Sequence, residues 1–335
     1  MIVRQVPWRP ERQIMSDQRR SEDVRHRIRE VCSPRAGNEG AAPQKERRGM
    51  GLRVDLPQDE AKNSTQLLIL AVYGRYSRLL GGWSSVADLI TLMERLGVPA
   101  QATRSAVDRM TRRDLLMPQR RGTVRGYAAT AKARLVFDEG DEVVYAPRQP
   151  APLEDGWVIV SFSVPEAERE KRYTLRKRLV WLGMGQLDSG LWIAPARVLP
   201  SVLKWVRRLG LEQYVDAFTA RHEGLGDTPA LARRAWNLEG LALAYDTYLR
   251  AWSPVLTAVR EAGGDCEPGD AFAVHTLALE QWMRFPYLDP GLPTVLLPAD
   301  WRGEAARELA HELRRLLENR AFEYVAATVG VPPGR

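Results

Sequence analysis

Residues 100–134 read AQATRSAVDRMTRRDLLMPQRRGTVRGYAATAKAR, and this stretch decides the fold of the first part of the chain. It holds nine Lys or Arg residues against Asp108 and Asp114, so its surplus of seven positive charges equals the formal charge of the whole protein. Residues 100–114 have helical spacing, and residues 116–129 are typical of two short strands around a basic turn. A helix followed by a basic hairpin predicts a winged helix, which places its helix in the major groove of DNA and its hairpin on the backbone.

The residues before this stretch predict a helix-turn-helix. We expect a first helix from the N-cap residues Asn63-Ser64 to the Gly81-Gly82 pair, followed by a short strand. Ser84 or Ser85 then caps a second helix, and Gly97 ends it ahead of a third helix that follows Pro99. Two helices separated by a short turn with glycine are the helix-turn-helix pattern. A short closing helix over residues 130–137 is expected after the hairpin.

The third helix carries the residue types that read bases. Its inward face is apolar, and its outward face contains Gln101, Arg104, Ser105, Asp108 and Arg112. Arg contacts guanine and Gln contacts adenine through paired hydrogen bonds, although the same stripe also allows simple i,i+4 surface ion pairs. The basic hairpin that follows favours DNA reading, with the hairpin on phosphates. The predicted DNA-binding residues are Gln101, Arg104, Ser105, Asp108, Arg109, Arg112, Arg120, Arg121 and Arg125.

The predicted fold class is a multidomain α+β protein. Residues 61–146 form the winged helix-turn-helix domain and residues 153–225 a ferredoxin-like domain with the order βαββαβ. Residues 228–327 form an all-α domain, and a Pro-rich linker joins the first two domains over residues 146–152. Residues 1–60 are a basic, disordered extension, which is either an arm that adds non-specific DNA affinity or a tail that precedes the true start.

A second basic run lies at the start of the ferredoxin-like domain. Residues 166–178 alternate acidic and basic side chains and end in Arg176-Lys177-Arg178. A solvated charged helix face is the first interpretation, and a phosphate site for a nucleotide-bearing ligand such as coenzyme A is the second. The tryptophans of the chain are mostly expected in the core, although one or two can line a ligand pocket. The candidate effector-binding residues are Arg176, Arg178, Trp192, Trp282 and Arg284.

Bulk properties exclude several classes of protein. Cys32 and Cys266 provide neither a disulfide framework nor metal-ligand spacing, and no apolar run approaches the roughly 20 residues that span a bilayer. Gly-rich phosphate loops, HExxH and Gly-x-Ser-x-Gly are missing, and the four histidines are isolated. We therefore predict a cytoplasmic protein that is not an enzyme and has no metal or cofactor. The pI near 9.6 favours a polyanionic partner.

Several motifs, in order, resemble one bacterial regulator family. The resemblance runs from Leu67 to Val325, and the family is PaaX, the repressors of phenylacetic acid degradation. The motifs are Tyr73-Gly-Arg-Tyr76, Arg104-Ser-Ala-Val-Asp-Arg-Met110, Trp181-Leu-Gly-Met-Gly-Gln186, Gly190-Leu-Trp-Ile-Ala-Pro195, Arg284-Phe-Pro-Tyr-Leu-Asp-Pro290 and Leu297-Pro-Ala-Asp-Trp301. The resemblance implies a homodimeric repressor on operator DNA that phenylacetyl-CoA releases, with the reading helix at Ala100–Arg113 and the wing at Met117–Ala129.

Two departures from related patterns bear on function. The middle domain is similar to small CRISPR-adaptation nucleases, which end their first strand with a metal-binding Asp, whereas Val160-Ser-Phe-Ser-Val-Pro165 has no acid. In the tail, Glu280-Gln281 stands where the family has a His-acidic pair, so the effector can be a different acyl-CoA. The function classes that compete with a repressor are a metal-dependent nuclease and a non-specific architectural DNA-binding protein.

Overall fold

A computed structural model describes residues 58–145, 150–224 and 226–330, with side chains from residue 64. The predicted disordered extension (1–60) and part of the predicted linker (146–152) thus lie largely outside the described residues. The chain forms two compact units, each built from separate segments. Unit 1 contains Asp141–Tyr245 and Met283–Gly303, and unit 2 contains the described chain up to Gly140 together with Asp246–Trp282 and the residues from Glu304. Two long helices and the closing helix cross the boundary between units, so the units differ from the sequential domains expected above.

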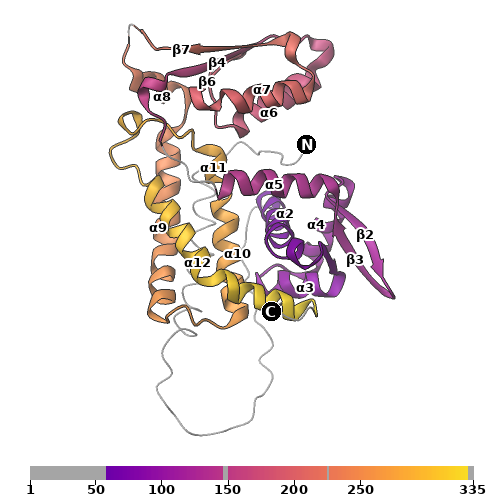
Figure 1. The fold of residues 1–335 in the computed structure, drawn as a ribbon. Coiled ribbons are helices and arrows are strands. Elements are labelled where there is room, and N and C mark those ends of the chain that lie inside the picture. The colour runs from indigo at the N-terminus through magenta and orange to yellow at the C-terminus, as the bar shows by residue number, and fades with distance from the viewer. Residues whose placement is uncertain (1–57, 146–149, 225, 331–335) are drawn as a thin grey trace. The chain divides into compact units, whose positions relative to one another are not determined.

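The first part of unit 2 has the elements that the sequence predicts. Helix α2 (Gln58–Arg75) is followed by strand β1 (Trp83–Ser85), helix α3 (Val86–Arg95) and helix α4 (Ala100–Arg112). Strands β2 (Leu116–Arg121) and β3 (Val124–Ala129) then form an antiparallel hairpin, and α5 (Ala131–Val144) follows it (Figure 1). The three strands form one sheet in the order β1-β3-β2.

Two helix ends in this part of the chain correct the sequence prediction. Asn63 and Ser64 lie inside α2, which begins at Gln58, because residues 58–62 carry good helix formers that extend the helix backward. The closing helix α5 continues to Val144 rather than ending at Phe137, despite Gly140 in its interior. Thr130 stands at the start of α5 and caps it, since its Oγ1 accepts a hydrogen bond from the Ala133 amide at 3.1 Å.

The second part of unit 2 consists of helices from the C-terminal third of the chain. These are the end of α9 (Leu238–Glu261), α10 (Pro268–Trp282) and α12 (Gly303–Thr328). Almost every residue of α10 after Pro268 is buried, and α10 also packs against α2. Unit 2 therefore joins the N-terminal helices and the C-terminal helices in one body.

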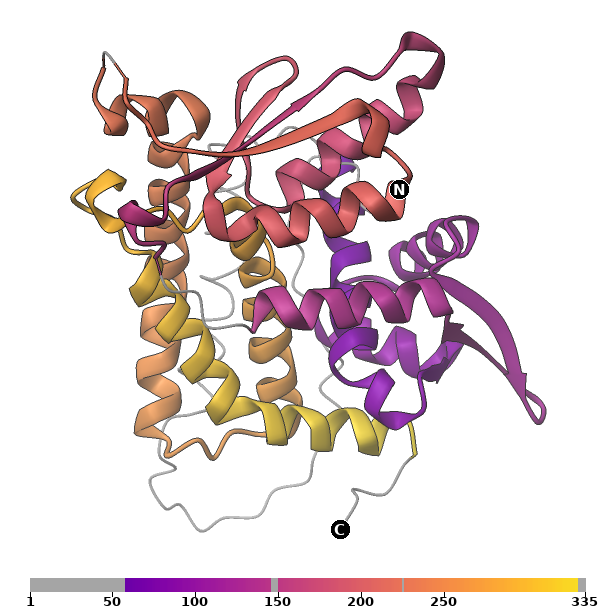
Figure 2. The same cartoon turned by 45° about the horizontal axis from the view of Figure 1, so that its top comes forward.

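Unit 1 is built on a four-stranded antiparallel sheet. Its elements run β4 (Trp157–Phe162), α6 (Arg169–Trp181), β5 (Gly185–Asp188), β6 (Leu191–Pro195), α7 (Leu199–Leu209) and β7 (Val215–Ala220). The strand order β5-β6-β4-β7 and the element order βαββαβ confirm the predicted topology of this segment. Both helices lie on one face of the sheet (Figures 1 and 2).

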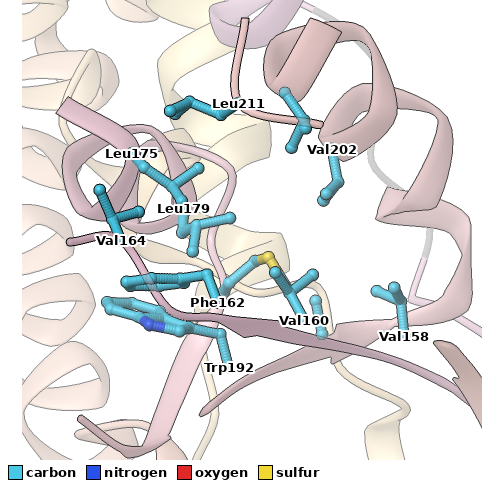
Figure 3. Close-up of a cluster of buried hydrophobic side chains, with 12 residues drawn as sticks. Val158, Val160, Phe162, Val164, Leu175, Leu179, Trp192, Val202 and Leu211 are labelled. Carbon is cyan, nitrogen blue, oxygen red and sulfur yellow. The ribbon is translucent and has the colours of Figure 1, made fainter. Parts of the chain in front are cut away.

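The two faces of this sheet bury different side chains. Val158, Val160 and Phe162 of β4 point to the α6–α7 side, because alternate residues of a strand face alternate sides. Figure 3 shows Phe162 and Trp192 lying against one another in this core, below Leu175 and Leu179 of α6. The opposite face is covered by α8 (Thr228–Ala235) and by the start of α9 and the loop that contains the 3-10 turn Thr294–Leu296; its buried residues are Trp157, Ile193, Ala232, Leu238, Leu292 and Leu296.

Candidate nucleic-acid interface

The turn between α3 and α4 is held by one cap and one glycine. Ser85 caps α3, since its Oγ accepts a hydrogen bond from the Asp88 amide at 3.0 Å. Gly97 adopts φ 79° just after α3, a conformation that favours glycine, and the chain enters α4 through Pro99. Thr103, on the first turn of α4, donates a hydrogen bond from its hydroxyl to the Pro99 carbonyl at 3.2 Å. These contacts fix the direction in which α4 leaves the turn.

Helix α4 has one buried face and one exposed face, as predicted. The buried residues are Thr103, Ala106, Val107 and Met110. On the opposite face Gln101, Arg104, Asp108 and Arg112 are exposed, while Ser105 and Arg109 are half-buried. Arg112 forms an i,i+4 ion pair with Asp108, and both side chains are largely exposed, at 71% and 64%. Such an exposed pair contributes little to stability, so a base or phosphate can replace it.

Arg109 lies at the edge of the exposed face among like charges. Partial burial lowers the pKa of the Arg109 guanidinium, and the neighbouring Arg113 and Arg112 lower it further, while Asp108 acts in the opposite direction. The side chain keeps its charge at neutral pH because an Arg pKa begins far above 7. A bound anion would offset the repulsion among Arg109, Arg112 and Arg113.

Three of the nine basic residues of this stretch hold the domain together. Lys132 donates from Nζ to the Arg113 carbonyl at the end of α4, at 2.7 Å. Arg113 itself donates to Gln66 Oε1 at 2.8 Å, and Arg134 donates to the Ala129 carbonyl at 3.1 Å. A lysine on the last carbonyls of a helix also interacts favourably with the helix dipole. These three side chains serve the fold, and the other six basic residues are among the nine residues predicted at the interface.

The hairpin presents opposed like charges. Arg120 of β2 lies directly across from Arg125 of β3, and the turn between them contains Gly122 at φ 59°. Residues 117–125 are all exposed, and the hairpin extends beyond the helices of its unit (Figure 2). Like charges directly opposite each other destabilise a strand pair, so this pairing weakens the hairpin unless an anion lies between the two guanidinium groups.

Arg121 has a different environment from its two neighbours. Its guanidinium lies 4.8 Å from the centroid of the Trp83 ring and donates to the Gly81 carbonyl at 3.2 Å. Trp83 in turn donates from Nε1 to the Gln119 carbonyl at 3.2 Å. Arg121 therefore braces the hairpin against β1. The sequence predicted a phosphate contact at this position, and the structure places the side chain against the domain.

Gly126 and Trp83 position the hairpin, and neither was among the residues predicted from the sequence. A Cβ on Gly126 would lie 2.4 Å from the Ser84 carbonyl oxygen and 2.5 Å from the Trp83 ring. Glycine at this point lets β3 approach β1 closely. A single glycine inside a strand pattern is the signal that marks such a close approach.

The five candidate effector residues have different surroundings. Trp192 is buried in the core in Figure 3, and Arg178 lies 3.6 Å from the centroid of the Trp205 ring. Arg176 reaches Gln186 only at 3.5 Å. Arg284 belongs to unit 1 and Trp282 to unit 2, where Trp282 packs near Tyr248 with ring centroids 6.0 Å apart. The pair Glu280-Gln281, which differs from the family pattern, is also buried. Glu280 is 1% exposed, and Gln281 Oε1 accepts a hydrogen bond from the Trp252 indole at 2.7 Å.

Over residues 58–145, 150–224 and 226–330, no three His, Cys, Asp or Glu side chains gather where a metal ion would bind. His222 contacts the Thr228 hydroxyl at 3.1 Å and His275 contacts the Tyr76 hydroxyl, while His26 lies outside the described residues. None of the helices in the described part of the chain is long and apolar enough to cross a membrane.

Known proteins and protein-family models match this chain well beyond the interface residues. Family models match three consecutive parts of the chain: "PaaX-like protein" at residues 64–133, "PaaX protein central Cas2-like domain" at 150–232 and "PaaX-like protein C-terminal domain" at 236–327. The transcriptional repressor PaaX of Escherichia coli (strain K12) is 26% identical over 262 residues, which are 77% of this chain and 82% of that protein.

A solved structure, the uncharacterized protein Rv0674 from Mycobacterium tuberculosis, is also similar. It is 24% identical, covers 79% of this chain and 98% of its own, and aligns with a TM-score of 0.48. The three family models follow one another in the order of that family and together cover most of residues 64–327. The chain belongs to the PaaX family.

Proposed function

We propose that this protein is a transcriptional repressor that binds operator DNA and is released by an acyl-CoA. Its similarity to the repressor of Escherichia coli supports the regulatory role. The proposed DNA-binding domain is the winged helix-turn-helix formed by α2–α4 and the β2–β3 wing. In this proposal α4 enters the major groove and the wing lies on the backbone.

The observation that carries this proposal is the exposed face of α4 followed by the opposed arginines of the wing. Arg104 is exposed, and within the described part of the chain it contacts no acid, so its guanidinium is available to a guanine edge. Arg120 and Arg125 face one another on an exposed hairpin. Backbone phosphate between them would turn their repulsion into two favourable contacts.

The second half of the proposal is homodimeric binding. A two-fold dimer would place two copies of α4 in successive major grooves, and the operator would be a palindrome with half-sites about 34 Å apart or a multiple of it. Because the target is chromosomal DNA, we expect the dimer in the cytoplasm.

The effector is proposed by family resemblance. Phenylacetyl-CoA or a related thioester would bind the C-terminal two thirds of the chain and favour a state whose reading helices no longer fit the operator, so that genes for aromatic acid breakdown are expressed. The size of the response depends on the difference in effector affinity between the two states.

A gel shift tests both operator binding and release by the effector. The probe is DNA from upstream of the protein's own transcription unit, with random DNA as competitor and with a panel of CoA thioesters added. We expect a shifted band that random DNA does not remove and that one thioester does. A band that random DNA removes equally well would instead support an architectural protein, and magnesium- or manganese-dependent cleavage of the probe would support a nuclease.

A further inference from the structure

Unit 1 carries a second concentration of positive charge, on helices α6 and α7. The two helices contain nine Lys or Arg residues against the single acid Glu170. They lie side by side on one face of the sheet, with Leu175 and Leu179 of α6 turned inward (Figures 1 and 3). The basic residues are Arg169, Lys171, Arg172, Arg176, Lys177 and Arg178 on α6 and Lys204, Arg207 and Arg208 on α7. We call these residues the α6–α7 basic face.

The acids at the start of α6 balance only part of this charge. Lys171 pairs with Glu168, and Arg172 pairs with Glu166 at 2.7 Å. When these two acids are counted with Glu170, the nine basic residues still exceed the three acids by six. Two adjacent helices with this surplus create a strong local positive potential.

Aromatic rings fix the direction of several of these cations. Arg178 and Arg208 lie 3.6 and 4.7 Å from the centroid of the same Trp205 ring. The Lys177 ammonium lies 3.9 Å from the Tyr173 ring, and Tyr173 is 50% exposed. Cations held over rings lose less side-chain entropy when they bind an anion.

The helix dipole explains the positions of only some of these basic residues. Arg207 and Arg208 are in the last turn of α7, where the helix dipole favours cations. Arg169, however, is the first residue of α6, where the dipole favours acids, and it is exposed. A basic residue in this position weakens the isolated helix, and an external anion would offset that cost.

We propose that the α6–α7 basic face binds the phosphate backbone of DNA that flanks the operator. This inference rests on the proposed function, because it assumes that DNA is the partner. Length favours DNA over a single nucleotide ligand: 13 helical residues span about 20 Å, over which each strand of a duplex presents about six phosphates. A coenzyme A head group would need convergent contacts in a concave pocket. The basic residues here lie along two helices; five of them are exposed and four are half-buried.

The test measures how affinity for a random-sequence duplex depends on salt, with the full-length chain. The first variant is Lys204→Gln with Arg207→Gln, two exposed residues of α7. The matched control is Arg233→Gln with Arg234→Gln, two exposed residues of α8 in the same unit, which removes the same charge elsewhere. Arg125→Gln in the wing is measured alongside, and thermal melts verify that each variant is folded.

We expect the α7 variant to lower the slope of log affinity against log salt by about 0.9 for each phosphate that the protein no longer neutralises, and the α8 control to leave the slope unchanged. An unchanged slope in the α7 variant, or an equal drop in the control, would overturn the inference. Weaker binding of coenzyme A with an unchanged DNA slope would also overturn it and assign the face to a small ligand. Failure of the proposed function is visible separately, because Arg125→Gln would then have no effect on DNA affinity.

Discussion

At the scale of single residues, the β2–β3 hairpin places one residue type in two environments within six positions. Arg120 and Arg125 face one another at the exposed tip, whereas Arg121 packs on Trp83. The sequence could identify all three as basic and close to a turn. It could not separate them, because the Trp83 ring that holds Arg121 comes from an earlier strand of the sheet.

Arg125→Gln is expected to weaken binding to all DNA sequences alike and to lower the salt slope by about 0.9. Its stability should not fall, because the change removes repulsion from Arg120. Arg121→Gln should instead lower the free energy of unfolding by about 0.5–1 kcal/mol, because the cation no longer packs on the Trp83 ring. Urea melts and salt titrations of both variants distinguish the roles. If Arg125→Gln and Arg121→Gln have equal salt slopes and equal free energies of unfolding, the two arginines do not have different roles.

His275 is a fully buried histidine of unit 2. Burial lowers the pKa of this histidine to about 3, and nearby Arg75 and Arg314 act in the same direction. Its Nδ1 contacts the Tyr76 hydroxyl, which also lies 3.2 Å from Thr276 Oγ1. The imidazole is therefore neutral in the folded state at any pH above about 3.

This environment predicts that folding stability depends on pH. The unfolded chain binds a proton at His275 near pH 6.5 and the folded chain does not, so stability is highest above that pH and falls as the pH drops toward 3. Each pH unit below 6.5 costs about 1.4 kcal/mol, which gives about 2 kcal/mol at pH 5. Urea melts of the wild type and His275→Gln at pH 5 and 7.5 measure the effect. The same pH dependence in the variant would assign it to other groups.

At the scale of secondary structure, local signals predicted the elements that have clear boundaries. The cap at Ser85 and the turn at Gly97 place α3 and α4, and the βαββαβ order follows from the strand and helix patterns. Helix α9 continues through Ser253-Pro254 to Glu261, although a proline often ends a helix. Both residues are exposed, so the helix tolerates the missing amide on its solvent side. The short helix α8 was missed, since it comes directly after a glycine-rich turn.

The close approach of β3 and β1 gives a prediction at this scale. Gly126→Ala would place a methyl group 2.4 Å from the Ser84 carbonyl and against Trp83, so the strands must separate. We expect a loss of about 1–3 kcal/mol in folding stability and weaker DNA binding. Gly226→Ala is the control, because a Cβ there meets nothing within 4 Å. If the two variants are equally stable, Gly126 does not set the spacing of these strands.

At the scale of the whole molecule, no pattern in the sequence indicated that helices α3 and α4 share a unit with the C-terminal helices. That arrangement depends on contacts between residues far apart in the chain. Arg95 at the end of α3 pairs with Glu267 at 3.0 Å and with Asp270 at the start of α10. Tyr76 reaches His275 and Thr276 in the middle of α10. These contacts link α10 directly to α3, the helix that precedes α4.

A double-mutant cycle tests this connection. Arg95→Gln and Asp270→Asn should each lower stability, and together they should lower it by less than the sum, with a coupling of about 0.5–1 kcal/mol for this partly buried pair. The ion pair between Asp265 and Arg320 of α12 is the comparison, because it includes no residue of α3. Asp265→Asn removes this pair. Strict additivity of Arg95→Gln and Asp270→Asn would show that α3 and α10 are not linked through this contact.

The proposed function depends above all on base reading by α4. Selection of binding sites from random DNA by the wild-type chain and by Arg104→Ala, followed by affinity measurements on the selected site, tests it. We expect the wild type to select a palindrome and the variant to accept other bases at one position of each half-site, at a cost of about 1–3 kcal/mol on the original site. An equal loss of affinity on selected and random DNA, with the preferred sequence unchanged, would rule out base reading and make Arg104 a phosphate contact.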